Sequence, residues 1–569
     1  MSLQFITGNS GNGKTKYLFN RIVKEAKANP RDNYLVIVPE QFTMQTQRQL
    51  VDLSENKAIM NIDVLSFKRL AYRVFDELGI TNLTVLEETG KNLVLRKLAA
   101  QEADKLGVIG RNLNRIGYIS EVKSLLSELV QYNISPEELG RYIASGRLSD
   151  TLSDKLKDVL VLYEAFEKFM KDKYITAEEI LNVLSNVAEE SAILRNSVIA
   201  FDEFTGFTPI QNQLIKKLFV ISKKIYVTLT IDCREDIFKS RGMQELFDMP
   251  KRTVKSLTEM AAFYGIEVEE PIILDKNYRL AENEELSFME QQLFRKRRCS
   301  FKKVPKHIHI DCLRDPKQEL TKIARRINEL VRNENLRYRD IAIVTGDVNI
   351  YAGYVREIFD KYNIPYFIDA TQEILFHPFI EFIRSIPDIA AQNFSADAVF
   401  RFLRCGFSEL LDSEIDVLEN YVLACGVRGK SAWDKKWVRL PKHKAGYDIE
   451  LLNQSREYIM ELLKPVYQVF SDKKSTVKDY VLAIYKLIVL LDIPDKLAKK
   501  EQALLDAGDQ TASKEYGQIY KIVMQLFEKY VAVLGDECMD AEEFTQILDA
   551  GLDAADVAVI PPGYDTVTI

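Results

Sequence analysis

The sequence predicts an α/β protein built on parallel sheets and interrupted by two long helical stretches. The first observation is a glycine-rich turn at residues 8–15, between a strand-like and a helix-like segment. The second is a series of short, nearly continuous apolar runs, which are typical of strands buried on both faces of a parallel sheet. The third is helical periodicity without strand signals from about residue 86 to 190 and again from about 376 to 543.

Length and composition restrict the number of domains, the cellular compartment and the kinds of binding site that can be expected. The chain has 569 residues, more than one hydrophobic core usually serves, so about three or four domains are expected. It has no apolar run long enough to span a membrane and no signal-peptide pattern, and its six scattered cysteines include no C-x-x-C pair. These features fit the reducing cytoplasm. Because the net charge is −7, nucleic-acid binding would need a local basic patch.

The glycine-rich turn reads Gly8-Asn9-Ser10-Gly11-Asn12-Gly13-Lys14-Thr15, the G-x-x-x-x-G-K-T pattern of a phosphate-binding loop. Its glycines let backbone N–H groups point at a phosphate, and the start of the next helix adds a partial positive charge. Lys14 is expected to reach the β- and γ-phosphates of ATP, and the Thr15 hydroxyl is expected to hold Mg²⁺. The alternative is an accidental glycine turn.

A metal-binding acid and a general base are expected after a later strand. Four apolar residues, Val198–Phe201, are followed by Asp202 and Glu203, which is the Walker B arrangement. Asp202 would hold Mg²⁺ through water, and Glu203 would be the catalytic base for hydrolysis. The alternative is an ordinary strand end with solvated acids.

The apolar runs predict two α/β domains. Strands are expected at 34–38, 62–67, 198–201, 225–230, 307–310, 340–345 and 366–369, with a helix at about 316–331. Domain 1 would cover residues 1–275, with a helical insertion at about 86–190. Domain 2 would cover 276–569, with a second insertion at about 375–560. The run Val567–Ile569 looks like an interrupted strand, which suggests a truncated chain.

Several stretches carry a family resemblance. Residues Asp202–Gln211 resemble the D-E-F-x-x-F-T-P-x-Q segment of UvrD-like superfamily 1 helicases, and Tyr338–Val344 resembles the segment that opens their second motor domain. Together with the phosphate-binding loop, Val38–Thr43 and His377–Ile380, they make the whole chain resemble AddB (RexB-like), the B subunit of bacterial ATP-dependent helicase/deoxyribonucleases. The resemblance implies two RecA-like P-loop NTPase domains, each with a large helical insertion.

The resemblance also implies a function. Such B subunits form a heterodimer with a helicase–nuclease A subunit. The heterodimer processes double-stranded DNA ends for recombinational repair of DNA damage and also handles single-stranded DNA. The B subunit is implicated in recognition of the Chi hotspot. The family's C-terminal nuclease, with its four-cysteine iron–sulfur cluster, is not recognisable before Ile569. We therefore expect a helicase-like, ATP-binding and DNA-binding half of a helicase/exonuclease, without nuclease activity of its own.

The chain departs from true motors at three places. Too few residues precede Gly8 to include the adenine-sensing glutamine. Residues 230–234 lack the glutamine that motors carry after the third core strand, and residues 345–349 lack their arginine. We therefore expect ATP binding with weak or absent hydrolysis. The alternatives are an autonomous P-loop NTPase or kinase acting on a small molecule, and a scaffold with a vestigial phosphate-binding loop.

Two further basic stretches each have two readings. The run 295–298, with three nearby lysines, could follow DNA phosphates or form a solvated face. Trp433 and Trp437, among several lysines and arginines, could stack on single-stranded DNA, or their four-residue spacing could face a helix core. His377 precedes Pro378 and is expected to cap a helix rather than to act in catalysis.

Overall fold

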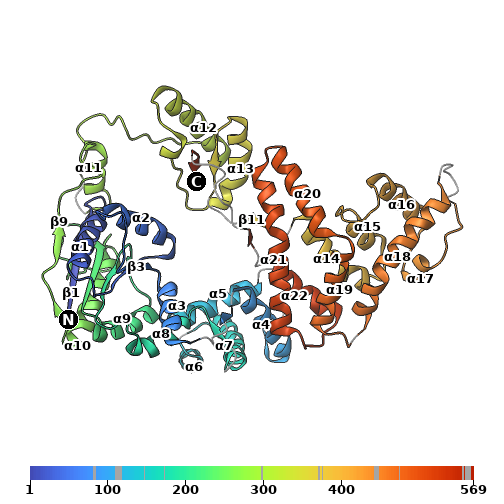
Figure 1. The fold of residues 1–569 in the computed structure, drawn as a ribbon, viewed down its shortest axis with the longest axis horizontal. Coiled ribbons are helices and arrows are strands. Elements are labelled where there is room, and N and C mark those ends of the chain that lie inside the picture. The colour runs from blue at the N-terminus through green and yellow to red at the C-terminus, as the bar shows by residue number, and fades with distance from the viewer. Residues whose placement is uncertain are drawn as a thin grey trace. The chain divides into compact units, whose positions relative to one another are not determined.

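The computed structural model describes residues 1–80, 85–86, 88–108, 110, 118–146, 148–171, 174–295, 299–368, 372–374, 376–440, 447–472, 474–553, 556–557 and 565–569. The chain forms two compact units (Figure 1). Unit 1 contains Met1–Leu86, Leu125–Gly146 and Glu167–Asp311, and unit 2 contains Glu87–Ser124, Arg147–Phe166 and Cys312–Ile569.

Unit 1 is built on a seven-stranded sheet in which all the described strand pairings are parallel. Its strands are β1 (Ser2–Gly8), β2 (Tyr34–Ile37), β3 (Ile62–Leu65), β6 (Val198–Phe201), β7 (Lys224–Thr230), β8 (Glu267–Val268) and β9 (Ile272–Leu274). Their order is β3-β2-β6-β7-β1-β8, and β9 also pairs with β1. The predicted α/β fold class with a parallel sheet is confirmed.

Helices cover both faces of this sheet, as burial of apolar strands on two sides requires. One face packs against α1 (Lys14–Ala28) and α2 (Thr43–Leu53). The opposite face packs against α3 (Phe67–Leu78), α8 (Ile180–Val187), α9 (Pro209–Ile221) and α10 (Asp248–Phe263). A last helix of the unit, α11 (Glu284–Gln292), follows β9. All the carboxyl ends of the parallel strands lie at one edge of the sheet, where the predicted site residues lie.

The predicted first insertion is helical. It contains α4 (Glu88–Gln101), α5 (Tyr118–Gln131), α6 (Pro136–Ala144) and α7 (Asp150–Met170) in addition to α8. The strands in its described part are β4 (Val85–Leu86) and β5 (Ile175–Thr176), which pair in parallel. The α4 helix lies in unit 2, and α5 and α7 belong in part to each unit.

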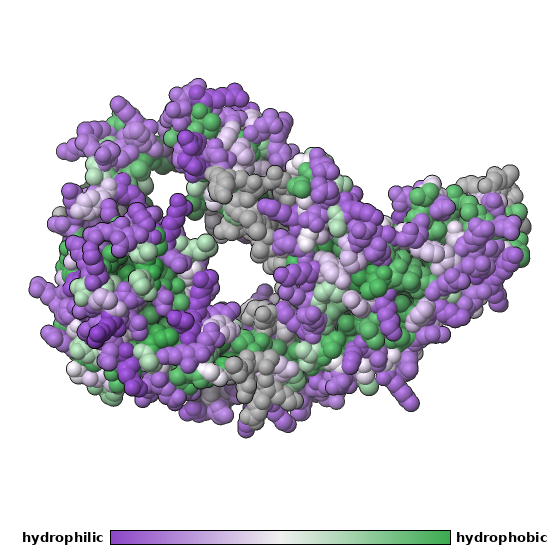
Figure 2. Space-filling view, in the orientation of Figure 1, coloured by the Kyte–Doolittle hydropathy of each residue, from purple (hydrophilic) through white to green (hydrophobic). Residues whose placement is uncertain are grey.

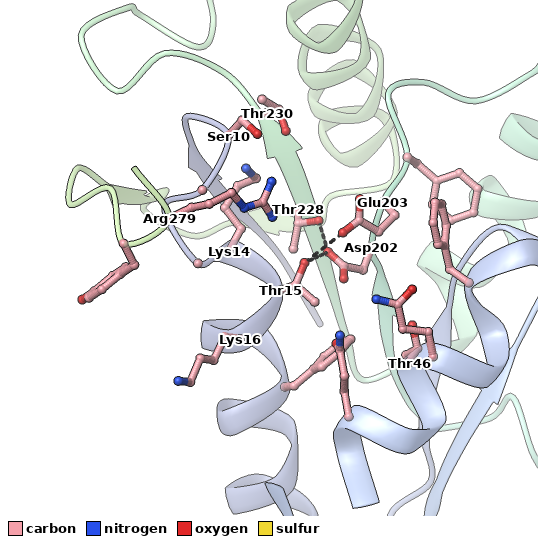
Figure 3. A pocket seen from close by; sticks show the side chains of 18 of the residues that line it. Ser10, Lys14, Thr15, Lys16, Thr46, Asp202, Glu203, Thr228, Thr230 and Arg279 are labelled. Carbon is pink, nitrogen blue, oxygen red and sulfur yellow. Dashed lines mark hydrogen bonds between the residues drawn. The ribbon is translucent and has the colours of Figure 1, made fainter. Parts of the chain in front are cut away.

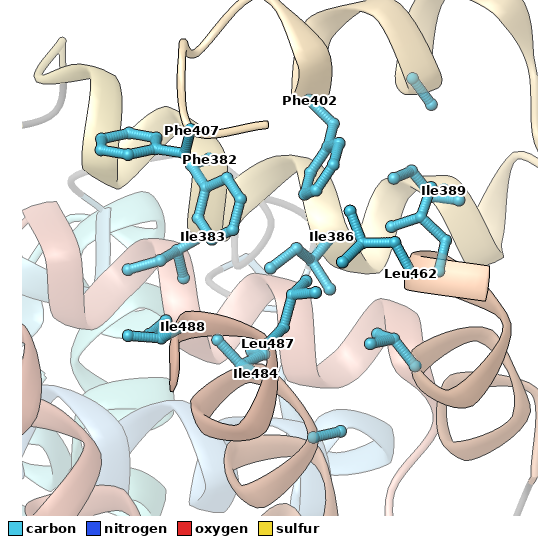
Figure 4. Close-up of a cluster of buried hydrophobic side chains, with 14 of the residues drawn as sticks. Phe382, Ile383, Ile386, Ile389, Phe402, Phe407, Leu462, Ile484, Leu487 and Ile488 are labelled. Atoms are coloured by element: carbon cyan, nitrogen blue, oxygen red, sulfur yellow. The ribbon is translucent and has the colours of Figure 1, made fainter. Parts of the chain in front are cut away.

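Unit 2 is mainly helical. After α12 (Pro316–Asn333) and α13 (Val348–Lys361) come α14 (Pro378–Ala391), α15 (Ala396–Leu403), α16 (Asp412–Cys425), α17 (Lys430–Asp434), α18 (Ile449–Ser471), α19 (Val477–Leu490), α20 (Ile493–Asp506), α21 (Gln510–Leu534) and α22 (Ala541–Asp553). Apolar side chains of α14, α15, α18 and α19 meet in a large core (Figure 4). The helical stretch predicted from about residue 376 is confirmed.

A small sheet in unit 2 pairs β10 (Tyr366–Phe367) in parallel with β13 (Val567–Thr568), and Ala342 bridges to Thr568. Helices α12 and α13 pack on it. A separate antiparallel pair joins β11 (Gln372–Glu373) and β12 (Asp556–Val557).

Two strand predictions in this region are wrong. Residues 307–310 form no strand, and 340–345 make only the single bridge at Ala342. The side chains of Ile310 and Val344 are 93% and 95% exposed, so these apolar runs lack the neighbouring strands that would bury them.

The surface is mostly polar, and hydrophobic side chains reach it over the helices of unit 2 (Figure 2). In the described ranges, no helix combines the length and the apolar character that crossing a membrane would need. All six cysteines are free thiols.

Candidate nucleotide-binding site

The loop between β1 and α1 has a backbone that only glycine adopts readily. Gly11 and Gly13 have φ angles of 87° and 78°, in the left-handed region. A Cβ atom on Gly8 would lie 2.6 Å from the Leu274 carbonyl oxygen. Helix α1 begins at Lys14, so its free N–H groups and partial positive charge face the loop. Backbone and helix together form a cradle for an anion such as a phosphate.

Lys14 lies in this cradle. Its Nζ donates a hydrogen bond to the Asn9 carbonyl oxygen at 3.0 Å. Burial lowers the pKa of Lys14, although the carboxylates of Glu203 and Asp202 oppose that shift. The surroundings of this partly buried ammonium screen its charge less than water does. Its attraction to a bound phosphate is therefore stronger than that of an exposed lysine.

The two predicted acids lie opposite Lys14 at the end of β6. The Thr15 hydroxyl is 3.3 Å from Asp202 Oδ1 and 3.2 Å from Glu203 Oε1. Asp202 also accepts a short hydrogen bond from Thr228 of β7. It is 1% exposed, and burial raises its pKa. The structure therefore brings Thr15 to Asp202 and Glu203, which lie 187 and 188 residues after it in the sequence.

Mg²⁺ fits this set of donors. The second carboxylate oxygen of Asp202, Oδ2, is buried and has no hydrogen-bond partner. Mg²⁺ usually takes one or two carboxylates together with substrate phosphates and water. In the ranges the structure describes, no group of three or more His, Cys, Asp or Glu residues is placed to hold a metal ion.

The backbone of Glu203 is strained. Its φ angle is 63°, in the left-handed region that residues other than glycine seldom adopt. Such strain persists where the surrounding structure determines it, and it is frequent at functional sites. Here it directs the Glu203 carboxylate at the Thr15 hydroxyl.

The segment after β9 adds residues that sequence reasoning missed. The backbone N–H groups of Tyr278 and Arg279 donate to the Gly11 carbonyl oxygen at 3.0 and 3.4 Å, and Asn277 Nδ2 donates to the Ser10 carbonyl oxygen at 2.9 Å. Tyr278 is 66% exposed. Arg279 lies beside Lys14 (Figure 3) and contributes to lowering its pKa. The sequence signal for this segment is weak, because Ile272–Leu274 is an apolar run of only three residues.

All these groups surround one pocket of about 730 Å³ (Figure 3). Its lining includes Lys14, Thr15, Asp202, Glu203, Thr228 and Arg279, and on the α2 side Phe42, Gln45, Thr46 and Gln49. A nucleoside triphosphate has the charge and the size to enter such a pocket, which lies within the usual range for ligand sites.

The segment in which motors carry a glutamine is engaged in an ion-pair network. Asp232 is 2.5 Å from Arg234 and 3.0 Å from Arg295. Burial opposes ionisation, but the hydrogen bonds and charges of these arginines lower the pKa of Asp232 to about 2. Arg295, the first residue of the predicted basic run, is therefore paired, and Lys296–Arg298 lie outside the described residues.

The remaining candidates are structural. Trp433 and Trp437 are 0% and 6% exposed, so of the two interpretations of this pair, burial in a core is confirmed and stacking on DNA is excluded. His377 caps α14, with its Nδ1 accepting a hydrogen bond from the Phe379 N–H at 3.1 Å. Its predicted role as a cap is confirmed.

Known proteins resemble this chain over its whole length. Residues 5–290 match the family model described as "ADDB, N-terminal". The chain is 38% identical over 579 residues to a protein of Lachnoclostridium phytofermentans that is named as the B subunit of an ATP-dependent helicase/deoxyribonuclease. It is 32% identical to the protein of the same name from Caldanaerobacter subterraneus and 31% to that from Clostridium acetobutylicum. Each match covers all of this chain and 50% of the relative, so the chain spans about half the length of these relatives.

Proposed function

Since the chain belongs to the AddB family, we propose that it is the nucleotide-binding, DNA-handling portion of the B subunit of an ATP-dependent helicase/deoxyribonuclease. The observation that supports this most directly is the meeting of Lys14, Thr15, Asp202, Glu203 and Arg279 around one pocket. In this proposal the partner is the A subunit, and the substrate is a broken double-stranded DNA end with its single strands. Recognition of Chi stays a prediction from the family.

Each residue has a distinct role in the proposed site. The N–H groups of residues 8–13 and the start of α1 hold the phosphates, and Lys14 neutralises the β- and γ-phosphates. Thr15 and Asp202 would hold Mg²⁺, which supplies charge neutralisation between the phosphates when it is bound. Tyr278 presents an exposed ring beside Gly13, where a nucleobase could stack.

Glu203 is the proposed general base for hydrolysis. It would accept a proton from the attacking water, while Arg279 would stabilise charge on the γ-phosphate. Residues 345–349 lack the arginine of true motors, and Arg279, from another part of the chain, lines the pocket instead. A glutamine after β7 is still lacking, since Asp232 and Arg234 pair with each other there. We therefore propose ATP binding with slow turnover.

Nucleotide titration tests this function. Lys14→Ala should weaken binding of a fluorescent ATP analogue at least tenfold, because a charge-assisted contact to phosphate contributes about 1.5–3 kcal/mol. Lys24→Ala is the matched control, since Lys24 is an exposed lysine on the same helix. Arg279→Ala should weaken binding of ATP more than binding of ADP. Equal affinities of the wild type and Lys14→Ala would refute the assignment of the loop.

A further inference from the structure

We propose that residues 435–440 of unit 2 form a rigid basic strap that contacts the phosphate backbone of DNA. The strap follows α17 and precedes α18 (Figure 1). It shares no residue with the nucleotide pocket. The choice of DNA as the anionic partner rests on the proposed function, whereas the anion-binding surface itself rests on the fixed backbone and the exposed cations of the strap.

Buried polar side chains hold the strap from beneath. Asn453, 4% exposed, receives the Trp437 N–H at 2.8 Å and donates to the Trp437 carbonyl oxygen at 2.9 Å. Arg456, 5% exposed, donates to the Trp433 carbonyl oxygen at 2.8 Å. The buried amide thus fixes the non-helical backbone at Trp437, and the buried guanidinium fixes the end of α17, from which the strap continues.

Two further contacts complete the fixation. The Tyr421 hydroxyl donates to the Arg439 carbonyl oxygen at 2.7 Å, and Trp437 Nε1 donates to the Ala432 carbonyl oxygen at 3.0 Å. The rings of Trp433 and Trp437 are 5.2 Å apart and pack in the core. The tryptophans therefore anchor the strap, and its backbone needs little ordering when a partner binds.

The basic side chains of the strap, unlike its anchoring residues, are exposed to solvent. Lys435, Lys436 and Arg439 are exposed, and none is in an ion pair with an acid among the residues that the structure describes. Neighbouring Lys430 differs, because its Nζ is 2.6 Å from Asp434 and lies over the Tyr467 ring. Three cations within five residues, unpaired on a fixed backbone, are suited to an external polyanion.

A nucleic acid fits this surface better than an acidic protein does. The exposed apolar side chains of the strap are Val438 and Leu440, at 83% and 54%. The area that two such side chains could bury is far below the roughly 1,000 Å² that a specific protein interface buries in total. Lysine and arginine contacts to phosphates need no apolar area and no base sequence. The chain's net charge of −7 makes a local patch necessary for such binding.

A salt titration tests the proposal. The triple variant Lys435→Ala, Lys436→Ala, Arg439→Ala is compared with the charge-matched control Lys464→Ala, Lys500→Ala, Lys521→Ala, whose lysines are exposed in the same unit. Binding of a labelled duplex with a single-stranded tail is measured by fluorescence anisotropy from about 50 to 200 mM salt. About 0.9 counterions are released per phosphate contact, so the negative slope of log K against log salt should become shallower by about 2–3 in the strap variant only.

Further readouts separate the possible outcomes. Unchanged tryptophan emission shows that the strap variant keeps its anchors, because Trp437 belongs to the strap and Trp433 packs against Trp437. Lys14→Ala should leave DNA binding by the strap intact, so failure of the nucleotide site and failure of the strap are distinguishable. Equal slopes in the strap variant and the control, or no DNA binding by the wild type, would overturn the proposal. Competition by polyglutamate as effective as that by DNA would also overturn it, in favour of an acidic protein.

Discussion

Replacing Glu203 by glycine should give a more stable protein than replacing it by alanine. Both variants lose the carboxylate and its contact with Thr15, so the comparison isolates the Cβ atom at a φ angle of 63°. A left-handed backbone costs a residue with a Cβ about 1–2 kcal/mol, which glycine avoids. Glycine also adds freedom to the unfolded chain, which costs about 0.4–1 kcal/mol. The free energy of unfolding of Glu203→Gly should therefore exceed that of Glu203→Ala by about 1 kcal/mol.

The sign of this difference is the informative result. In an exposed helix interior glycine is about 1 kcal/mol less stable than alanine. Lys216 is an exposed residue of α9 in the same unit and provides that control pair. The two positions should therefore rank glycine and alanine in opposite order.

Amide hydrogen exchange of peptides from β6 and β7 is the appropriate assay. Tryptophan fluorescence would not report on unit 1, because both tryptophans lie in unit 2. A difference of about 1 kcal/mol changes the population of open states about fivefold, so exchange should be about fivefold slower in Glu203→Gly than in Glu203→Ala. Protection of the alanine variant equal to or greater than that of the glycine variant would refute the argument that the base is held in a strained conformation.

Three other predictions concern activity and pH. Steady-state phosphate release should stay well below about 1 s⁻¹, the low end for phosphoryl-transfer enzymes, and should change little with single-stranded DNA; fast, DNA-stimulated release that disappears in Glu203→Gln would instead identify a motor. The purified chain should not degrade labelled duplex ends in the presence of Mg²⁺, and degradation absent from a mock preparation would contradict this. Burial lowers the pKa of His377 to about 4, below the roughly 6.5 of an unfolded chain, so the unfolded state binds the additional proton and stability falls as pH drops from about 6.5 to 4. His377→Asn keeps a capping side chain and should show a weaker pH dependence of unfolding by tryptophan fluorescence, and an identical dependence would argue against this titration.

The elements predicted correctly have local signals. The phosphate-binding loop is specified within eight residues by its glycines, and Asp202 and Glu203 follow an apolar strand directly. Because parallel strands end at one edge of a sheet, those two signals are enough to predict that the loop and the acids meet. The helical stretches were predictable from their 3.6-residue periodicity.

The features that were missed depend on tertiary neighbours. Strand β9 has three residues, too few for a pattern, and only its pairing with β1 brings Arg279 to the loop. The runs at 307–310 and 340–345 have strand composition, but apart from the bridge at Ala342 their residues are not paired with a neighbouring strand. Trp433 and Trp437 have helical spacing, yet α17 ends at Asp434, so they do not share one helix face. Asn453 and Arg456 hold their backbone, and the hydrophobic core of unit 2 buries both rings.

The small sheet of unit 2 has a consequence for the order in which the protein folds. Its two paired strands, β10 and β13, are separated by about 200 residues that include α14 to α22. Closing a flexible loop of that length costs roughly 5 kcal/mol more than closing a minimal one, and two-residue strands contribute too few hydrogen bonds to offset it. The helices must therefore pack first and bring the strand ends together. The sheet would therefore form after α14 to α22, and weakening the helical core should release β13 from β10 before the helices themselves unfold.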